Sequence, residues 1–329
     1  MSEPGANDSS SNSKLPNDER WAREVLGKLA LAAVTEQRRA RRWNIFFKLL
    51  FFGYLVTLLV LAWPDDLSTA TGSVKRHTAL IKIDGLIASS TEANAKNVIE
   101  SLRKAFKDDK TAGVILEINS PGGSPVQSGE IYDEIQQLRQ KHPKIPIHAV
   151  TGDVCASGGY YIAAAAQNIY ANKASIVGSI GVRMDSFGFT DAIAKLGIER
   201  RAYTAGNNKD FLDPFKPVNP EEVQHLQGML DAIHQQFISA VKQGRGERLK
   251  ENAEIFSGLM WTGEQSVNLG LVDALGNTRY VAEEIIGEKN LLDYTKRTRL
   301  VDRLFDGVES SLGAVLLNVL GLDGAVQWR

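Results

Sequence analysis

The stretch GDVCASGGYYIAAAA, residues 152–166, holds one serine among small side chains, and a run of alanines ends it. Ser157 precedes Gly158 and Gly159, where a helix is expected to begin. The small neighbours either let two backbones pack closely or leave space around a reactive hydroxyl. A helix N-terminus favours negative charge, which suits acyl chemistry, but the same position equally suits a plain N-cap.

A serine is a nucleophile only when a nearby base takes its proton. Histidine is the usual base, but no motif in this chain points a histidine at Ser157. The G-x-S-x-G turn is also absent, because CASGG lacks the first glycine. A Ser-His-Asp triad is therefore poorly supported. The five histidines are His77, His142, His148, His225 and His234.

A lysine can act as the base instead, provided that burial keeps its amine neutral. Lys209 stands in the turn-rich stretch AYTAGNNKDFLDPF, between Gly206 and Pro214. Composition alone favours a solvated loop lysine at this position. The residues by themselves therefore leave the base open.

Paired glycines supply a further element of acyl chemistry. Gly122 and Gly123 follow a buried strand pattern in EINSPGGS. Without side chains, their backbone N–H groups can approach a substrate closely, as an oxyanion hole requires. A simple turn after Pro121 explains the same pair. Cys155, two residues before Ser157, is interpreted as a small buried residue rather than a reactive one.

The elements that would position these residues alternate between strand and helix patterns. Alternation of this kind is typical of an α/β fold. Strands are expected over 78–87, 112–119 and 144–150, with extended chain over 168–182. Helices are expected over 94–108, over 128–142, from Ser157 onward, and over 220–246.

Composition places the chain among globular proteins. It has 329 residues, of which 43% are hydrophobic and 23% charged. The formal net charge of -1 gives no reason to expect nucleic acid as a partner. The single cysteine excludes an intrachain disulfide and a zinc site made of cysteines. We expect no cofactor and no metal.

An apolar segment near the N-terminus predicts a transmembrane anchor over residues 43–63. From Ile45 to Trp63 the chain carries one charge, Lys48. At about 1.5 Å rise per residue, such a helix nearly spans a hydrocarbon core of roughly 30 Å. Four arginines precede the span, which predicts a cytoplasmic N-terminus and export of everything after it. They are Arg38, Arg39, Arg41 and Arg42.

A cleaved signal peptide is the competing interpretation, and an uncleaved anchor is favoured over it. The region before the span is long, and no clean small-x-small site follows directly. The expected organisation has five parts. A largely disordered cytoplasmic tail over 1–42 precedes the anchor, and a linker over 64–77 follows it. A catalytic domain over 78–290 and a helical extension over 291–329 make up the rest of the chain.

Four motifs in order resemble the signal peptide peptidase A family of membrane-bound serine proteases. They are NSPGG, ASGGYYIA, GSIGV and AGNNKD, and the resemblance runs from Ala79 to Asp273. It includes GRG and WTGEQSVNLGLVDALG, and its length fits the short form with one protease domain. The fold that it implies is the crotonase- and ClpP-like spiral of ββα units.

The resemblance implies a role for each matching residue. Ser157 matches the nucleophile, Lys209 the general base, and Ser179 a serine that helps to hold the lysine. Gly123 matches the oxyanion-hole glycine, joined by the N–H of Gly158. The resemblance also implies a homo-oligomer in which protomers share the Ser/Lys dyad.

The expected function is cleavage of signal-peptide remnants and other extended apolar peptides. The expected location is a bacterial inner membrane, with residues 43–63 in the lipid bilayer and the protease domain on the periplasmic side. Two alternatives stay open. A crotonase-type acyl-CoA enzyme would use the same fold and oxyanion hole, and a non-catalytic membrane scaffold would keep the fold alone.

Overall fold

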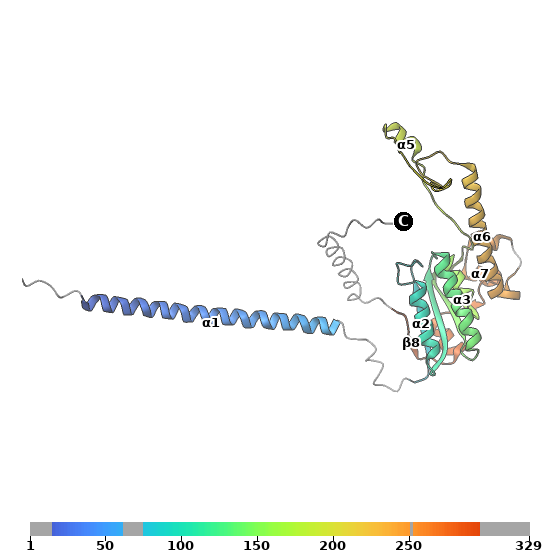
Figure 1. Ribbon diagram of the computed structural model, residues 1–329. Helices are drawn as coiled ribbons and strands as arrows, with labels where there is room; N and C mark the ends of the chain where they lie inside the picture. Colours follow the sequence, from blue (N-terminus) through green and yellow to red (C-terminus); the bar gives the residue numbers. More distant parts are fainter. Residues whose placement is uncertain (1–14, 62–74, 251–252, 297–329) are drawn as a thin grey trace, which may run out of the picture. The chain divides into compact units, whose positions relative to one another are not determined.

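A computed structural model describes residues 15–61, 75–250 and 253–296 of the chain. These residues fall into two compact units, with a boundary between residues 71 and 72. The N-terminal unit contains one long helix, α1, Leu15–Leu61 (Figure 1). The second unit, which reaches residue 299, contains the remaining helices and strands.

Helix α1 includes parts of two predicted segments, the N-terminal tail and the membrane anchor. The tail predicted to be largely disordered is helical from Leu15 onward, where Ala and Leu favour the helix and Glu24 pairs with Lys28 at 3.2 Å. The predicted anchor coincides with α1 as far as Leu61, and its last two residues lie outside the described ones. None of the described helices is both long enough and apolar enough to cross a membrane.

The second unit is a mixed α/β domain built on one eight-stranded sheet. Its principal strand order is β6-β5-β3-β2-β1-β8, with β4 and β7 joined beside β3. All pairings are parallel except that of β5 with β6. The strands are β1 His77–Asp84, β2 Thr111–Ser120, β3 Ile147–Ala156, β4 Asn168–Ala171, β5 Ile176–Gly178, β6 Met260–Thr262, β7 Ala274–Leu275 and β8 Leu291–Asp293.

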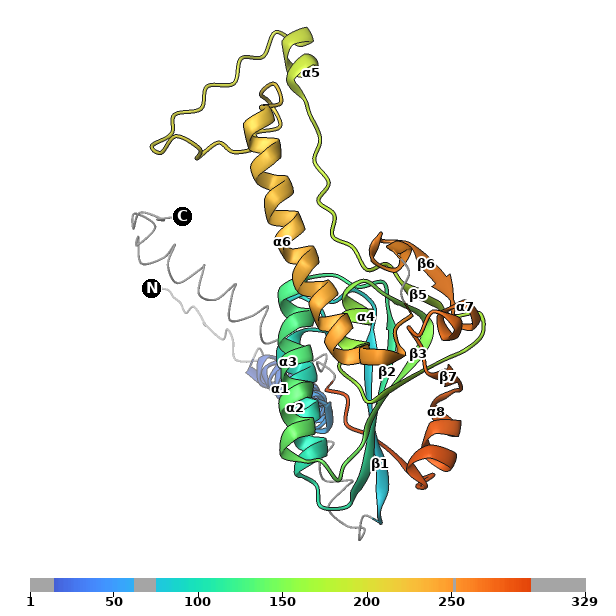
Figure 2. The ribbon, with the colours of Figure 1, turned by 90° about the vertical axis from the view of Figure 1, so that its right-hand side faces the viewer.

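Helices α2, α3 and the lower part of α6 cover one face of this sheet, and α8 lies against the other (Figure 2). Side chains alternate between the two faces, so Val114 and Leu116 enter the larger core while Ile115 enters the smaller one. The helices are α2 Ala95–Lys107, α3 Pro125–Lys141, α4 Gly158–Ala163, α5 Thr190–Lys195, α6 Pro220–Arg245, α7 Gly263–Asn268 and α8 Thr278–Tyr280. Short 3-10 helices lie at Gly246–Arg248 and Ala253–Phe256, and a π-helical segment follows α8 at Val281–Ile286.

Local sequence explains where the two helices around the site begin. Ser124 caps α3 by accepting a hydrogen bond from Gln127 N, and Asn219 caps α6 through Glu221 N. A proline follows each cap, in the first turn where no backbone donor is lost. The predicted helix over 220–246 therefore agrees with α6 almost residue for residue.

The chain between β5 and α6 leaves the sheet and extends outward (Figure 2). Residues 184–219 of this segment are called the arm below. No residue from 181 to 219 is buried. The contacts within the arm are local: Arg200 pairs with Asp213 at 2.8 Å, and its guanidinium stacks 4.9 Å from the Phe215 ring centre.

The end of the domain lies slightly beyond the predicted limit at residue 290. Strand β8 pairs with β1 through Thr78–Leu80, so Leu291–Asp293 are part of the sheet. Tyr294 then stacks on His77, with ring centres 5.8 Å apart. The helix predicted for the rest of the extension lies outside the described residues from 297 onward.

Candidate active site

Ser157 stands at the junction of β3 and α4 in a strained backbone conformation. Its φ is 50° and its ψ is -122°, which an L-residue adopts only when surrounding contacts hold it there. Ser157 N donates to Gly178 O at 2.8 Å, and Ser157 O accepts from Tyr161 N at 2.9 Å. Its side chain makes no capping hydrogen bond, so the residue is not acting as an ordinary N-cap.

Gly122 and Gly123 turn the chain toward this serine, and no other residue type fits. Both have positive φ values, 101° and 149°. A β-carbon on Gly122 would lie 2.7 Å from both Gly158 N and Ser157 Cβ. One on Gly123 would lie 2.1 Å from Ile87 O. The pair therefore does more than make a plain turn, because the glycines let three segments meet at the serine.

Residue Ile87 holds the glycine turn in place from the other side. Ile87 N donates to Gly122 O at 2.9 Å, and Ser124 N donates to Ile87 O at 2.8 Å. The N–H groups of Gly123 and Gly158 are left without a hydrogen-bond partner among the described residues. Two free donors beside a serine hydroxyl form the arrangement that an oxyanion hole needs.

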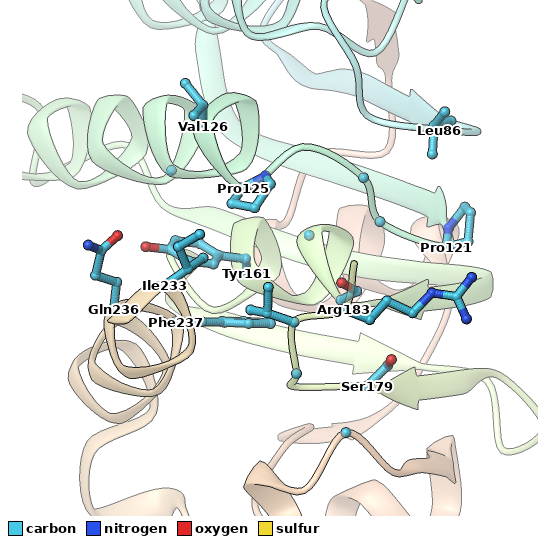
Figure 3. A pocket seen from close by; sticks show the side chains of 18 of the residues that line it. Leu86, Pro121, Pro125, Val126, Tyr161, Ser179, Arg183, Ile233, Gln236 and Phe237 are labelled. Carbon is cyan, nitrogen blue, oxygen red and sulfur yellow. The ribbon is translucent and has the colours of Figure 1, made fainter. Parts of the chain in front are cut away.

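A cavity of about 920 Å³ opens over these groups. Figure 3 shows Tyr161, Ile233 and Phe237 together at one end and Pro121 and Ser179 at the other. The residues that line it are Leu86, Pro121, Gly122, Gly123, Pro125, Val126, Gly129, Glu130, Asp133, Ser157, Gly158, Tyr161, Ser179, Gly181, Val182, Arg183, Ile233, Gln236, Phe237, Ser257 and Gly258. Its size and shape suit an extended peptide.

The structure brings together every predicted site residue except one. Ser157, Gly123, Gly158 and Ser179 all line the cavity. Ser179 shares the positive φ of Ser157, at 53°, and its N–H donates to Leu259 O at 2.7 Å. Lys209 does not line the cavity; it is exposed in the arm, which extends away from the sheet (Figure 2).

The apolar wall of the cavity was not predicted from the sequence. Phe237 of α6 stacks on Tyr161 of α4 at 4.8 Å between ring centres, and Tyr161 meets Tyr132 edge-on at 5.4 Å. Ile233 and Phe237 are four residues apart, a spacing that shows an apolar helix face but not what covers it. The packing of α6 against α4 is what turns that face toward Ser157.

A buried ion pair fixes the end of α6. Arg245 donates to Asp273 Oδ2 at 2.8 Å and to Gly270 O at 2.9 Å. Burial acts to raise the pKa of Asp273, but hydrogen bonds from Arg245 and from Ile169 N hold that pKa below its usual value. Close packing adds to this, since a β-carbon on Gly244 would lie 1.9 Å from Ala164 O. The motifs GRG and LVDALG thus support the wall of the cavity.

No histidine lines the cavity within the described residues. His148 lies on β3, where burial lowers the pKa of the imidazole to about 4 despite the nearby Asp273 carboxylate. Cys155 is fully buried, and burial raises the pKa of its thiol, as expected for a structural residue. The part of the chain that the structure describes also contains no group of three or more His, Cys, Asp or Glu side chains able to hold a metal ion.

Two sequence profiles match this domain: that of peptidase family S49 over residues 139–292, and that of Clp protease over residues 77–177. A Synechocystis sp. protein named as a candidate protease is 34% identical over 81% of this chain and 94% of its own length. The chain belongs to the signal peptide peptidase A family of serine peptidases. An Enterococcus faecium member, named as a candidate signal peptide peptidase, is 31% identical over 68% of this chain and 67% of its own length.

A different name accompanies another strong match. A Brucella abortus protein named as the Na⁺/H⁺ antiporter NhaA is 45% identical over 215 residues. These residues are 65% of this chain but only 29% of the Brucella protein. Most of that protein therefore lies outside the match, and the shared part corresponds in size to the peptidase domain. The resemblance to the peptidase family and the coarse α/β fold are confirmed.

Proposed function

We propose that this protein is a membrane-anchored endopeptidase that cuts signal-peptide remnants and other extended apolar peptides. One observation carries the proposal: the Ser157 hydroxyl lies in a peptide-sized cavity beside the free N–H groups of Gly123 and Gly158. Membership of a serine peptidase family and the ClpP-like part of the domain support it. We infer the same spiral of ββα units for the finer fold.

The chemistry that we infer is acyl transfer. Ser157 Oγ attacks the carbonyl carbon of the scissile bond, and its proton passes to the amine of Lys209. The N–H groups of Gly123 and Gly158 stabilise the negative charge that develops on the carbonyl oxygen. Lys209 then protonates the leaving amine as the C–N bond breaks. A water molecule, deprotonated by Lys209, attacks the ester on Ser157; as the ester C–O bond breaks, Lys209 returns that proton to Ser157 Oγ and the acid is released.

In this proposal Lys209 reaches Ser157 from a neighbouring copy of the chain. Lys209 is exposed, and an ammonium in water cannot accept a proton. The arm that carries it also exposes apolar side chains, including Leu196 at 72% and Tyr203 at 91% exposure. Exposed apolar surface of this kind favours association with another protein surface. Ser179 would then hold the incoming amine at the far end of the cavity.

The membrane anchor is proposed on the pattern of residues 43–63. The described side chains of its apolar part are exposed, among them Phe47, Leu49 and Phe52 at 58%, 66% and 66%. The four arginines before it favour a cytoplasmic N-terminus, so the peptidase domain lies on the periplasmic side of a bacterial inner membrane. A lipid bilayer would cover the exposed apolar side chains.

A fluorophosphonate probe, which forms a phosphonate ester on an activated serine and releases fluoride, tests the central claim. We expect the probe to label the purified full chain at Ser157 and to fail on Ser157→Ala. Ser257→Ala is the matched control, because Ser257 lines the same cavity but its hydroxyl is bonded to Glu254 O at 2.6 Å. Labelling that persists in Ser157→Ala, or a chain that never reacts, would contradict the proposal. The second result would favour the non-catalytic scaffold.

A further inference from the structure

Ser128 is a buried serine that neither the family motifs nor the proposed mechanism uses. It lies on α3, four residues after the cap, and is 0% exposed. Its hydroxyl has no hydrogen-bond partner among the described residues. A buried, unpaired hydroxyl lowers stability, and an alanine would avoid that loss. The hydroxyl is therefore not explained by the packing of α3.

The position of this hydroxyl gives it a role. A β-carbon on Gly158 would lie 2.4 Å from Ser128 Oγ and 3.3 Å from Gly123 N. Ser128 Oγ thus packs against Gly158, on the side of that residue on which Gly123 N also lies, and both glycines line the cavity. It does not line the cavity itself, so it would not touch a substrate.

The two donors need support of this kind because they come from separate segments. Gly123 belongs to the turn after β2, and Gly158 begins α4. Glycine backbone moves easily, and an oxyanion is stabilised only when both N–H groups reach it at hydrogen-bond distance. A hydroxyl packed against Gly158 on the side of Gly123 would limit that movement once it bonds to a neighbouring peptide group.

We propose that Ser128 is a positioning residue for the oxyanion hole. As a substrate carbonyl draws the N–H groups of Gly123 and Gly158 together, the Ser128 hydroxyl bonds to the peptide backbone beside them. The partner that is missing in the resting chain is thus supplied in the working site. This inference rests on the proposed function, because it assumes acyl chemistry at Ser157.

The chain offers a matched control in Ser266. This serine, on α7, is also 0% exposed and also has an unpaired hydroxyl, but it does not line the cavity and does not contact either glycine. Ser128→Ala and Ser266→Ala remove the same chemical group from equally buried positions. We expect neither change to lower the melting temperature, since each removes an unsatisfied hydroxyl.

The experiment measures the rate at which the fluorophosphonate probe phosphonylates Ser157, together with kcat and KM on an apolar peptide. We expect Ser128→Ala to slow the reaction with the probe and to lower kcat about tenfold or more, with KM within about twofold, because only stabilisation of the transition state is lost. Ser266→Ala should match the wild type. Ser128→Cys, which fills the space but donates weakly, should fall between Ser128→Ala and the wild type.

The outcomes separate the two claims. If the wild type reacts and Ser128→Ala and Ser128→Cys react at the rate of Ser266→Ala, the positioning role is wrong and the proposed function stands. If KM alone rises, Ser128 shapes substrate binding and the positioning role is also wrong. If the wild-type chain does not react with the probe at Ser157, the proposed function itself fails.

Discussion

Ser157 and Lys209 lie in two regions that the chain builds in different ways. The serine region consists of β3, α4 and the Gly122–Gly123 turn, where strained backbone is held by close contacts and by the core. The arm has no buried residue, and its contacts are local. One half of the proposed dyad is therefore preformed within a single chain, whereas the other half depends on what covers the arm.

This contrast has a physical cause. The strained backbone at Ser157 and the unpaired donors beside it both lower stability. They persist only where the surrounding packing holds them rigidly. A lysine base has the opposite requirement, because it must leave water to lose its charge. A surface formed between copies of the chain meets that requirement without burying a lysine in the folded monomer.

Complementation gives the largest expected effect and tests whether the two halves come from different chains. Ser157→Ala and Lys209→Ala should each lower peptidase activity about 10³-fold or more. When the two variants are co-assembled, random mixing restores roughly a quarter of the wild-type activity, since one in four sites pairs an intact serine with an intact lysine. Ser157→Ala mixed with the double variant should stay inactive. Confirmed mixed assemblies without activity would place the dyad within one chain.

A side chain at the Gly122–Gly123 turn should impair the oxyanion hole beside Ser157 and leave the arm with Lys209 unchanged. Gly123→Ala forces a β-carbon against Ile87 O, so we expect acylation of Ser157 to slow about 10²-fold or more in the folded protein. Gly129→Ala is the control, because Gly129 lines the same cavity with open space where its β-carbon would go. It should keep its activity and gain up to about 1 kcal/mol of helix stability. Equal rates for the two variants would show that the turn does not form the hole.

The buried ion pair between Arg245 and Asp273 tests how strongly α6 is anchored beside the serine region. Asp273→Asn leaves Arg245 charged and buried, which lowers the free energy of unfolding by about 3–5 kcal/mol. Glu283→Gln breaks the pair with Arg279, whose side chain is 82% exposed. This change should alter the free energy of unfolding by about 1 kcal/mol or less. Chemical denaturation of the isolated variants measures both. Similar losses would mean that Asp273 does not anchor α6.

Mild acid gives the smallest expected effect and distinguishes the two regions by pH. His148 stays neutral in the fold because burial lowers its pKa to about 4, whereas the unfolded chain takes up a proton near pH 6.5. Stability should therefore fall as the pH drops from about 6.5 to 4, by on the order of 3 kcal/mol. Melting curves of His148→Gln should lose this dependence, and those of His225→Gln, next to Phe211 at the base of the arm, should keep it. If His148→Gln behaves as the wild type, another group governs the acid response.

Much of the fold could be predicted because its signals are local. Apolar spacing predicts α3, although the predicted start lies three residues after Pro125, and a proline with two glutamates in the first turn predicts α6. The parallel strands follow from short apolar runs between helices. Helix α1 begins at Leu15, within the tail over 1–42 that composition predicts to be largely disordered, because Ala and Leu favour the helix there.

For the site, the sequence by itself determined which residue types are present: a serine among small residues, a glycine pair, and motifs in the order of one peptidase family. Residue type carries that information, because a nucleophile or a side-chain-free turn requires particular residues. Only the tertiary structure decided which groups meet. Ile87, Ser128 and Phe237 contact the residues around the serine from segments 29–80 residues away, and Lys209 does not line the same cavity. Such contacts depend on how the sheet and helices pack, and no local pattern records them.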